Sequence, residues 1–306
     1  MTTTATRTPT RTPGQMARAR QWKSFAQFCR DFSGYKAGMF GLIFLVVVAV
    51  IALLAPVIAP SWMLDVTKIG TPDRFAPPSG EHLLGTDNQG RELWVRMVWG
   101  ARSSLAVGLA ATAMSMIIGT IVGMAAGHFR GWFGGLMMRI IDFFLVLPSL
   151  ILAIVLSSVL ERGTLTIIIA IGLTSWAGTA RVVRAQTLAV ESRDYIERSR
   201  ALGASHWHLM TKHLLPGVLP LVLANTTLTI GSAIIAESTL AFLGLGDPLT
   251  QSWGTILKNA TDASSASNGY WWYILIPGLA IVLVVLAFTL IGRAVENILN
   301  PTLRSR

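Results

Sequence analysis

Long runs without charged residues alternate along the chain with short polar segments. Asp, Glu, Lys and Arg are absent from residues 37–64, 103–127, 143–160, 163–180, 214–236 and 263–292. A helix needs about 20 predominantly apolar residues to cross the ~30 Å hydrocarbon core of a bilayer. The pattern therefore predicts an all-α membrane protein with six transmembrane helices. They are expected at about residues 39–59, 101–126, 139–160, 164–183, 215–243 and 271–292.

Composition favours one membrane domain over two soluble ones. Of the 306 residues, 52% are apolar and only 13% are charged, and the mean hydropathy is +0.57. Soluble domains carry about 25% charged residues. The single cysteine, Cys29, excludes an intrachain disulfide and a cysteine-based metal site. Gly119, Gly123 and Gly127 repeat at a four-residue spacing that lets helices approach closely, which predicts tight packing of the second span.

The distribution of basic residues predicts the orientation of the spans. Seven Lys and Arg lie within the first 38 residues, and the positive-inside rule places this segment in the cytoplasm. Six spans return the C-terminus to the cytoplasm, so 18 of the 25 basic residues lie on that side. This asymmetry accounts for the net charge of +10 without a nucleic-acid partner. The expected parts are a basic tail (1–38, partly disordered), a first span (39–59), an extracytoplasmic loop (60–100), a core (101–292) with a cytoplasmic loop at 184–214, and a C-terminal tail (293–306).

The cytoplasmic stretch ERSRALGASHWHLMTKHLLP, residues 197–216, predicts two helices joined at a glycine. Gly203 stands where a left-handed C-terminal cap belongs, and Ser205 can cap the second helix. Pro216 falls near the start of the fifth span, which the second helix enters. The segment is thus expected to be a rigid lever. Helical spacing predicts a narrow buried stripe on its first helix, formed by Tyr195, Ile196, Ser199 and Leu202.

Motifs for nucleotide or metal chemistry are missing from the sequence. There is no G-x-x-x-x-G-K-[ST], and the glycine-rich AFLGLGDP at 241–248 lacks the lysine, so any use of ATP requires another chain. His206, His208 and His213 lie close in sequence, but no carboxylate or cysteine completes a ligand set with them. We therefore expect no metal site, no catalytic residues and no cofactor in this chain.

Three other polar features lie at or within the spans. Glu237, late in the fifth span, either lines a pathway or makes a structural hydrogen bond to the backbone, because an ionisable group is costly there. Asp142 is expected to pair with Arg139, one helical turn away. The aromatic run at 270–273 is typical of an interfacial belt.

The glycine-centred stretch resembles the cytoplasmic "EAA" loop of ABC importer permeases. That loop runs Glu-Ala-Ala, three residues, Gly, nine residues, Ile, one residue, Leu-Pro. Glu197, Gly203, Leu215 and Pro216 stand at those spacings. The alanines and the isoleucine are replaced, by Arg198, Ser199 and His213.

Two further stretches resemble the C-type subunit of dipeptide/oligopeptide/nickel importers. HLLGTDNQGRE at 82–92 is similar to its His-x-Leu-Gly-Thr-Asp-x-x-Gly-Arg-Asp segment, with Glu92 in place of Asp. AESTLAFLGLGDPLTQSWGTIL at 236–257 is similar to its Ala-Glu-x-x-Leu-Ser-Phe-Leu-Gly-Leu-Gly and Ser-Trp-Gly elements, with Ala241 where Ser is commoner. The resemblance covers about residues 25–300.

The resemblance implies a type I ABC importer permease fold and two groups of functional residues. The first group would couple the chain to an ATPase: Tyr195, Ile196, Glu197, Ser199, Ala201, Leu202, Gly203, Ala204, Ser205, Leu215 and Pro216. The second would belong to the pathway or to an extracytoplasmic family motif: Gly85, Thr86, Asp87, Gly90, Arg91, Glu237, Phe242, Gly244, Gly246 and Trp253.

The resemblance also implies the partners and the cargo. The expected complex contains a second, homologous permease chain as a heterodimer, two ABC ATPase subunits that bind ATP and Mg²⁺ and contact the cytoplasmic loop, and an extracytoplasmic substrate-binding protein. The chain itself would be a non-catalytic, multi-pass protein of the bacterial cytoplasmic membrane that carries peptides. Nickel or another small solute is an alternative cargo. A self-contained secondary carrier is a more distant alternative, for which only Glu237 offers an intramembrane charge.

Overall fold

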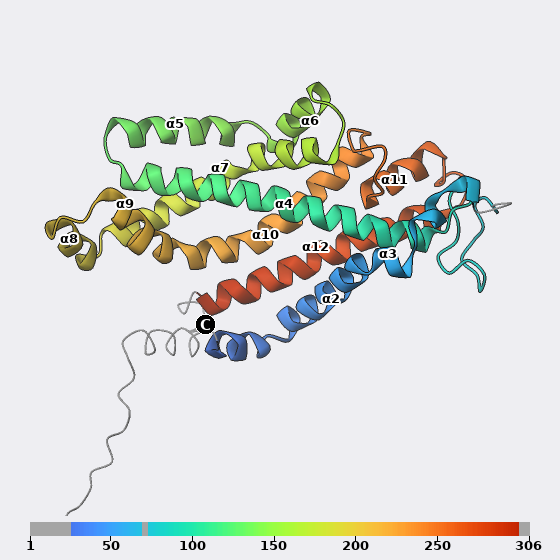
Figure 1. The fold of residues 1–306 in the computed structure, drawn as a ribbon, viewed down its shortest axis with the longest axis horizontal. Coiled ribbons are helices and arrows are strands. Elements are labelled where there is room, and N and C mark those ends of the chain that lie inside the picture. Colours follow the sequence, from blue (N-terminus) through green and yellow to red (C-terminus); the bar gives the residue numbers. More distant parts are fainter. Residues whose placement is uncertain (1–25, 69–72, 300–306) are drawn as a thin grey trace, which may run out of the picture.

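The computed structural model describes residues 26–68 and 73–299, and it is an elongated bundle of helices (Figure 1). Five long helices and one bent pair run along it, and short helices gather at its two ends. The helices are α2 (Lys36–Leu53), α3 (Ala55–Ile58), α4 (Leu93–His128), α5 (Trp132–Val146), α6 (Ser149–Val159), α7 (Thr164–Glu191), α8 (Asp194–Ala201), α9 (His206–Leu209), α10 (Leu215–Phe242), α11 (Trp253–Asp262) and α12 (Trp271–Leu299).

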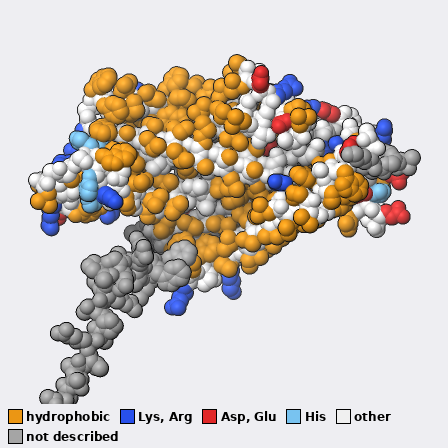
Figure 2. Space-filling model, in the orientation of Figure 1, with side chains coloured by type: hydrophobic (Ala, Val, Ile, Leu, Met, Phe, Trp, Pro, Cys, Tyr) orange, Lys and Arg blue, Asp and Glu red, His pale blue; other side chains and the backbone are white. Residues whose placement is uncertain are grey.

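We name the two ends by what they carry. The elbow end carries α8 and α9, and the loop end carries residues 73–92 and α11 (Figure 1). Figure 2 shows apolar side chains covering most of the length between the ends, with charged side chains gathered mainly toward the ends. This distribution fits a protein that presents apolar side chains to lipid and charges to water.

The third predicted span is bent rather than continuous. α2, α4, α7, α12 and the run from His206 to Phe242 are each long and apolar enough to cross a membrane, and α5 with α6 makes a sixth span if the bent pair counts as one. The two pieces meet at an angle of 86°. Pro148 explains the break, because it has no N–H to donate and it disfavours helical geometry at the preceding Leu147. The prediction of one helix over 139–160 is therefore wrong, and the first piece begins at Trp132.

Three helices extend beyond their predicted spans into the polar segments. α12 runs to Leu299 rather than ending at 292, so the first seven residues of the predicted C-terminal tail are helical. α4 begins at Leu93 rather than at 101, so the last eight residues of the predicted outer loop are helical. α7 continues to Glu191 rather than ending at 183, so residues 184–191 of the predicted cytoplasmic loop belong to it. Charged residues end a membrane span but do not end a helix. Within the predicted part of α7, Arg181 lies 2.6 Å from Asp142, so the predicted pair between Asp142 and Arg139 is wrong.

The glycine ridge of α4 packs against α7, as predicted. A Cβ added to Gly123 would lie 2.5 Å from the carbonyl oxygen of Ala180, and one on Gly119 would lie 2.8 Å from that of Trp176. Gly127 faces Thr187 in the same way. Because no side chain fits at these three positions, the two backbones approach closely along much of their length.

Candidate functional site

The predicted glycine-centred segment forms an elbow of two short helices, which we define as residues 194–209. α8 ends in a Schellman motif, in which the N–H of Ala204 donates to the carbonyl of Ser199 (3.1 Å) and that of Gly203 to the carbonyl of Arg200 (3.0 Å). Gly203 has φ +83°, as this cap requires. The side chain of Ser205 accepts from the backbone N–H of His208 (3.3 Å) and caps α9. Both predicted caps are confirmed.

The elbow buries little of its apolar surface within the chain. Ile196 is fully buried, in a cluster with Leu209 and Leu214, but Tyr195 is 42% exposed and Leu202 is 88% exposed. The predicted buried stripe is thus wrong for Tyr195 and Leu202, while Ile196 is buried and Ser199 is half-buried, because α8 is only two turns long. Trp207 is also exposed, by 75%. Exposed apolar side chains that lie close together are typical of a contact with another protein.

A π-helical segment, Met210–Leu214, joins the elbow to α10. Leu215 and Pro216 occupy the first turn of α10, where the missing N–H of proline is tolerated. The chain therefore runs from α9 to Phe242 without a non-helical break. A displacement of α9 would be passed directly to a membrane span.

A polar cluster centred on the buried His128 and Glu191, which the sequence did not reveal, holds the elbow to the bundle. His128, the last residue of α4, bonds to the carboxylate of Glu191 at the end of α7 through Nδ1, and its Nε2 lies 2.8 Å from Nδ1 of His206. Arg200 of α8 lies 3.6 Å from the same carboxylate, and Arg130 lies 3.8 Å from it. We call this set the latch. It connects α4, α7, α8 and α9, and proximity in the sequence could not show it because His128 and His206 are 78 residues apart.

The other two histidines of the stretch 197–216, His208 and His213, make weaker contacts. His213 Nε2 lies 3.4 Å from the hydroxyl of Ser199, and its ring lies beside that of Tyr195. His208 is exposed. Among the residues that the structure describes, no group of three or more His, Cys, Asp or Glu is arranged to hold a metal ion.

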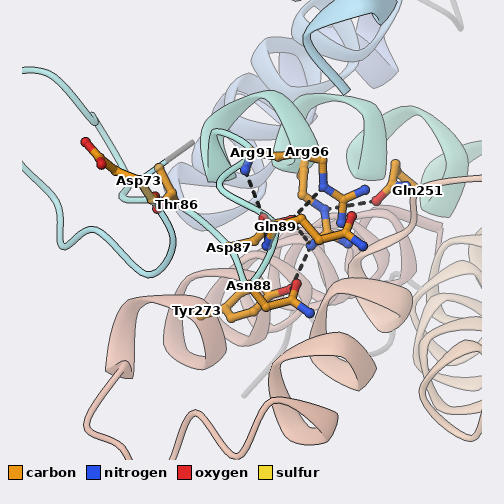
Figure 3. Close-up of polar contacts among 9 residues, drawn as sticks. All are labelled: Asp73, Thr86, Asp87, Asn88, Gln89, Arg91, Arg96, Gln251 and Tyr273. Atoms are coloured by element: carbon orange, nitrogen blue, oxygen red, sulfur yellow. Dashed lines mark hydrogen bonds and ion pairs between the residues drawn. The ribbon is translucent and has the colours of Figure 1, made fainter. Parts of the chain in front are cut away.

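At the loop end, a fully buried Asp87 organises a polar network (Figure 3). Its Oδ2 accepts from Nε of Arg91 (2.7 Å) and Nη1 of Arg96 (2.9 Å), and its Oδ1 accepts from the backbone N–H of Gln89 (2.8 Å) and of Arg91 (2.9 Å). Arg96 is itself fully buried and also donates to Gln251 (3.0 Å). The network joins the outer loop, α4 and the segment before α11.

Tyr273 of α12 completes this network. Its hydroxyl accepts from Arg96 (2.8 Å) and donates to the side chain of Asn88 (3.3 Å). Tyr273 and the neighbouring Trp272 are buried, whereas Trp271 is 56% exposed. The predicted interfacial belt is therefore wrong for Trp272 and Tyr273, which pack inward because the outer loop covers them.

The other predicted loop-end residues lie in the same folded loop. The hydroxyl of Thr86 donates to the carbonyl of Asp73 (2.5 Å) and accepts from the backbone of Ala76 (2.8 Å). Gly85, at φ +78°, leaves no room for a Cβ beside Trp272. Gly90, at φ +77°, donates its N–H to the carbonyl of Asp87 (3.1 Å). Gly85, Thr86, Asp87, Gly90 and Arg91 thus come together, and each of them shapes the loop.

Glu237 is buried where α10 meets α4 and α11. Its Oε2 accepts from the hydroxyls of Ser104 (2.9 Å) and Ser238 (3.2 Å). The backbone N–H of Trp253 donates to Ser104 (3.3 Å), which extends the chain of bonds to α11. Of the two alternatives for this carboxyl, the structure shows a structural hydrogen bond, to side-chain hydroxyls rather than to backbone. Phe242, Gly244 and Gly246 lie just beyond, around the end of α10.

Comparison with known proteins identifies the family. The family described as "Binding-protein-dependent transport system inner membrane component" matches residues 119–305. A second family, "N-terminal TM domain of oligopeptide transport permease C", matches residues 22–78. The chain belongs to the binding-protein-dependent transport permeases. It is accordingly a multi-pass membrane permease of the bacterial ABC importer family, and its resemblance to the C-type subunit is confirmed.

Characterised relatives align with this permease over most of its length. It is 37% identical to the oligopeptide transport system permease protein OppC of Bacillus subtilis over 274 residues, which are 89% of this chain and 88% of the relative. It is 36% identical to the di/tripeptide transport system permease protein DppC of Pseudomonas aeruginosa over 286 residues, 91% of this chain and 92% of the relative. Sequence identities this high over most of both chains imply a shared fold.

A solved structure shows the same fold at lower identity. An inward-facing structure of the MetNI methionine ABC transporter superposes with a TM-score of 0.51 and 22% identity, over 66% of this chain and 97% of that chain. The predicted importer permease fold is thus confirmed.

Proposed function

We propose that this permease is one half of the translocation pathway of a peptide importer, and that separate ATPase subunits drive it through the elbow. The elbow end would lie in the cytoplasm, in line with the basic residues of the N-terminal region. A second permease chain would complete the pathway, and a substrate-binding protein would deliver the peptide at the loop end. ATP and Mg²⁺ would be bound by the ATPase subunits, and this chain would be non-catalytic.

The exposed surface of the elbow carries this proposal. Leu202 and Trp207 present apolar surface that no part of the described chain covers. Meanwhile the backbone of the elbow is fully capped, and the latch ties it to two membrane-spanning helices. A segment with a fixed backbone that exposes both apolar side chains and the charged residues of α8 suits a contact that must transmit force.

The functions named for the relatives support peptides as the cargo. The aligned relatives named above are permeases for oligopeptides and di/tripeptides, and a further relative, of Pectobacterium atrosepticum, is a glutathione transport permease. Nickel is not favoured, because none of these relatives carries a metal ion. A secondary carrier is also not favoured. The bent third span is a feature that such a carrier could use, but Glu237 is engaged by two hydroxyls and the family depends on a binding protein.

Substitution at the elbow tests the coupling role. We expect Gly203→Asp or the charge reversal Glu197→Lys to reduce peptide uptake at least tenfold in proteoliposomes that contain the whole complex, while ATP hydrolysis continues. A Cβ at Gly203 meets no atom within 4 Å, so the change strains the cap without a clash. A left-handed backbone costs a residue with a Cβ about 1–2 kcal/mol.

Gly269→Asp is the matched control. Gly269 also has a positive φ (+78°) and open space around it, but it lies at the loop end. It should show a similar loss of stability with uptake still coupled to ATP hydrolysis. Normal uptake by both elbow variants would contradict the proposed role, and nucleotide binding by the purified single chain would contradict the assignment of ATP to the partners.

A further inference from the structure

A small cavity lined by hydroxyl groups lies beside the bend in the third span. Its volume is about 190 Å³, and it is bounded by α6, α7 and α10. The polar groups that line it are Ser149, Thr174, Ser175, Ser232 and Thr239. All five are uncharged, and no ionisable side chain lines the cavity.

The cavity lies deep within the membrane-spanning part of the bundle. Ser175 is 11 residues from the start of α7, which places it about 16 Å along that helix at a rise of 1.5 Å per residue. Ser149 lines the same cavity from the first turn of α6, which lies at 86° to α5. A hydrocarbon core is ~30 Å thick, so this part of α7 lies near its middle.

Hydroxyl groups at this depth face outward from the chain. Ser149 and Ser232 are exposed and Ser175 is half-buried. Other outward positions at this level are apolar: Ile117 and Ile121 of α4 are 59% and 57% exposed. Apolar residues also line the cavity, among them Leu150 and Ile235. Outward side chains that face lipid are expected to be apolar, so the outward hydroxyl groups are expected to face something else.

The broken helix supports the same conclusion. The last turn of α5 ends at Val146 and Leu147, and Pro148 has no N–H to offer its carbonyl groups. Irregular backbone at membrane depth is tolerated only where protein covers it or where it lines a water-filled cavity. The cavity begins at Ser149, directly after this break, and its hydroxyl groups provide polar partners beside the irregular backbone.

We propose that this cavity is the permease's binding surface for the main-chain amides of the passing peptide. Thr174, Ser232 and Thr239 donate to carbonyls of their own helices, so their oxygens are left to accept from a peptide N–H. A serine hydroxyl can also donate to a peptide carbonyl. The absence of charge leaves no preference for a charged side chain or terminus. Such a surface would accept peptides of many sequences. The inference rests on the proposed transport function, because it takes the cargo to be a peptide.

Thiol labelling tests the cavity independently of the cargo. The chain has a single cysteine, so Cys29→Ser gives a cysteine-free background. In the assembled complex in proteoliposomes, Ser175→Cys and Ser232→Cys should react with a water-soluble methanethiosulfonate at least tenfold faster than Ile117→Cys. Ile117 is the control at the same level, because the neighbouring Gly119 packs on Trp176 of α7 and Ile117 is exposed among apolar side chains. If Ser175→Cys and Ser232→Cys react no faster than Ile117→Cys, the cavity is covered by lipid or by a partner helix, and the proposal is overturned.

Peptide transport then tests the ligand. Trialanine at saturating concentration should slow the labelling of Ser232→Cys at least threefold, and Ser232→Leu should reduce trialanine uptake at least tenfold while Ser232→Thr keeps it. Ser158→Leu is the control, since Ser158 is an exposed α6 hydroxyl that bonds to its own helix as Ser232 does. Fast labelling that trialanine leaves unchanged, in a complex that transports trialanine, would overturn the amide site. A complex that transports no peptide would overturn the proposed function, and the labelling rates would still test whether the cavity faces water.

Discussion

Each end of the bundle carries one of the family motifs, but the motif is buried at one end and exposed at the other. At the loop end, Asp87 and Arg96 are both fully buried, and the family motif folds into the protein. At the elbow end, Leu202 and Trp207 are largely exposed, and the family motif faces outward. A sequence motif thus identifies a region, and burial decides whether its residues hold the chain together or contact a partner.

The carboxylate at the centre of each end shows the difference most clearly. Asp87 binds two guanidinium groups at 2.7 and 2.9 Å, with Arg91 and Arg96 11% and 0% exposed. Glu191 lies 3.6 and 3.8 Å from guanidinium groups that are 47% and 75% exposed. Water screens the longer, exposed pairs, so they can rearrange at little cost. Buried ion pairs therefore hold the loop end, whereas at the elbow end only the bond between His128 and Glu191 is shielded from water and the arginine contacts can rearrange.

The largest effect is expected from breaking the loop-end network. Asp87→Ala leaves Arg96 buried without its ionic partner, and removing one member of a buried pair costs about 3–5 kcal/mol. Thermal unfolding of the purified permease in detergent would measure the loss. Asp142→Ala is the control, because the pair of Asp142 with Arg181 is exposed and should contribute less than about 1 kcal/mol. An equal loss of stability in the two variants would contradict the expected difference between buried and exposed ion pairs.

A smaller change in stability but a larger change in coupling is expected at the latch. His128→Ala removes both bonds that tie α4 to Glu191 and His206, at a cost of about 1–3 kcal/mol. The elbow would then move without α4, so ATP hydrolysis by the complex should continue with fewer peptides imported per ATP. His208→Ala changes an exposed histidine of α9 and should leave the number of peptides imported per ATP unchanged. An unchanged ratio in His128→Ala would reduce the latch to a purely structural contact.

The smallest effect is a pH dependence at the loop end. His82 Nδ1 lies 2.5 Å from the carboxylate of Glu92, and this hydrogen bond raises the pKa of His82 above its ordinary value of 6.5. A raised pKa stabilises the fold fully below pH 6.5, and the contribution is lost as pH rises through the pKa of the folded state. For a partly exposed pair we expect about 0.2–1 kcal/mol. Unfolding of His82→Gln should therefore show a smaller difference between pH 5.5 and pH 8.5 than the native chain, by roughly this amount. An identical pH dependence would show that other groups govern it.

Much of the architecture could be predicted because local physical rules govern it. Charge-free runs located the spans, since transferring a charge into hydrocarbon is costly whatever the fold. The caps at Gly203 and Ser205 followed from backbone geometry within a few residues. The ridge at Gly119, Gly123 and Gly127 followed from helical spacing alone.

Whatever depended on a distant segment was decided only by the tertiary structure. Tyr273 and Trp272 are buried because a loop nearly 190 residues earlier covers them, and Leu202 is exposed because nothing in the described chain covers it. His128, Glu191 and His206 meet only when the ends of three helices come together. Helical spacing predicts which residues share a face of a helix, but it cannot predict what packs on that face. The burial of these residues, their hydrogen-bond partners and the latch all depend on what packs there.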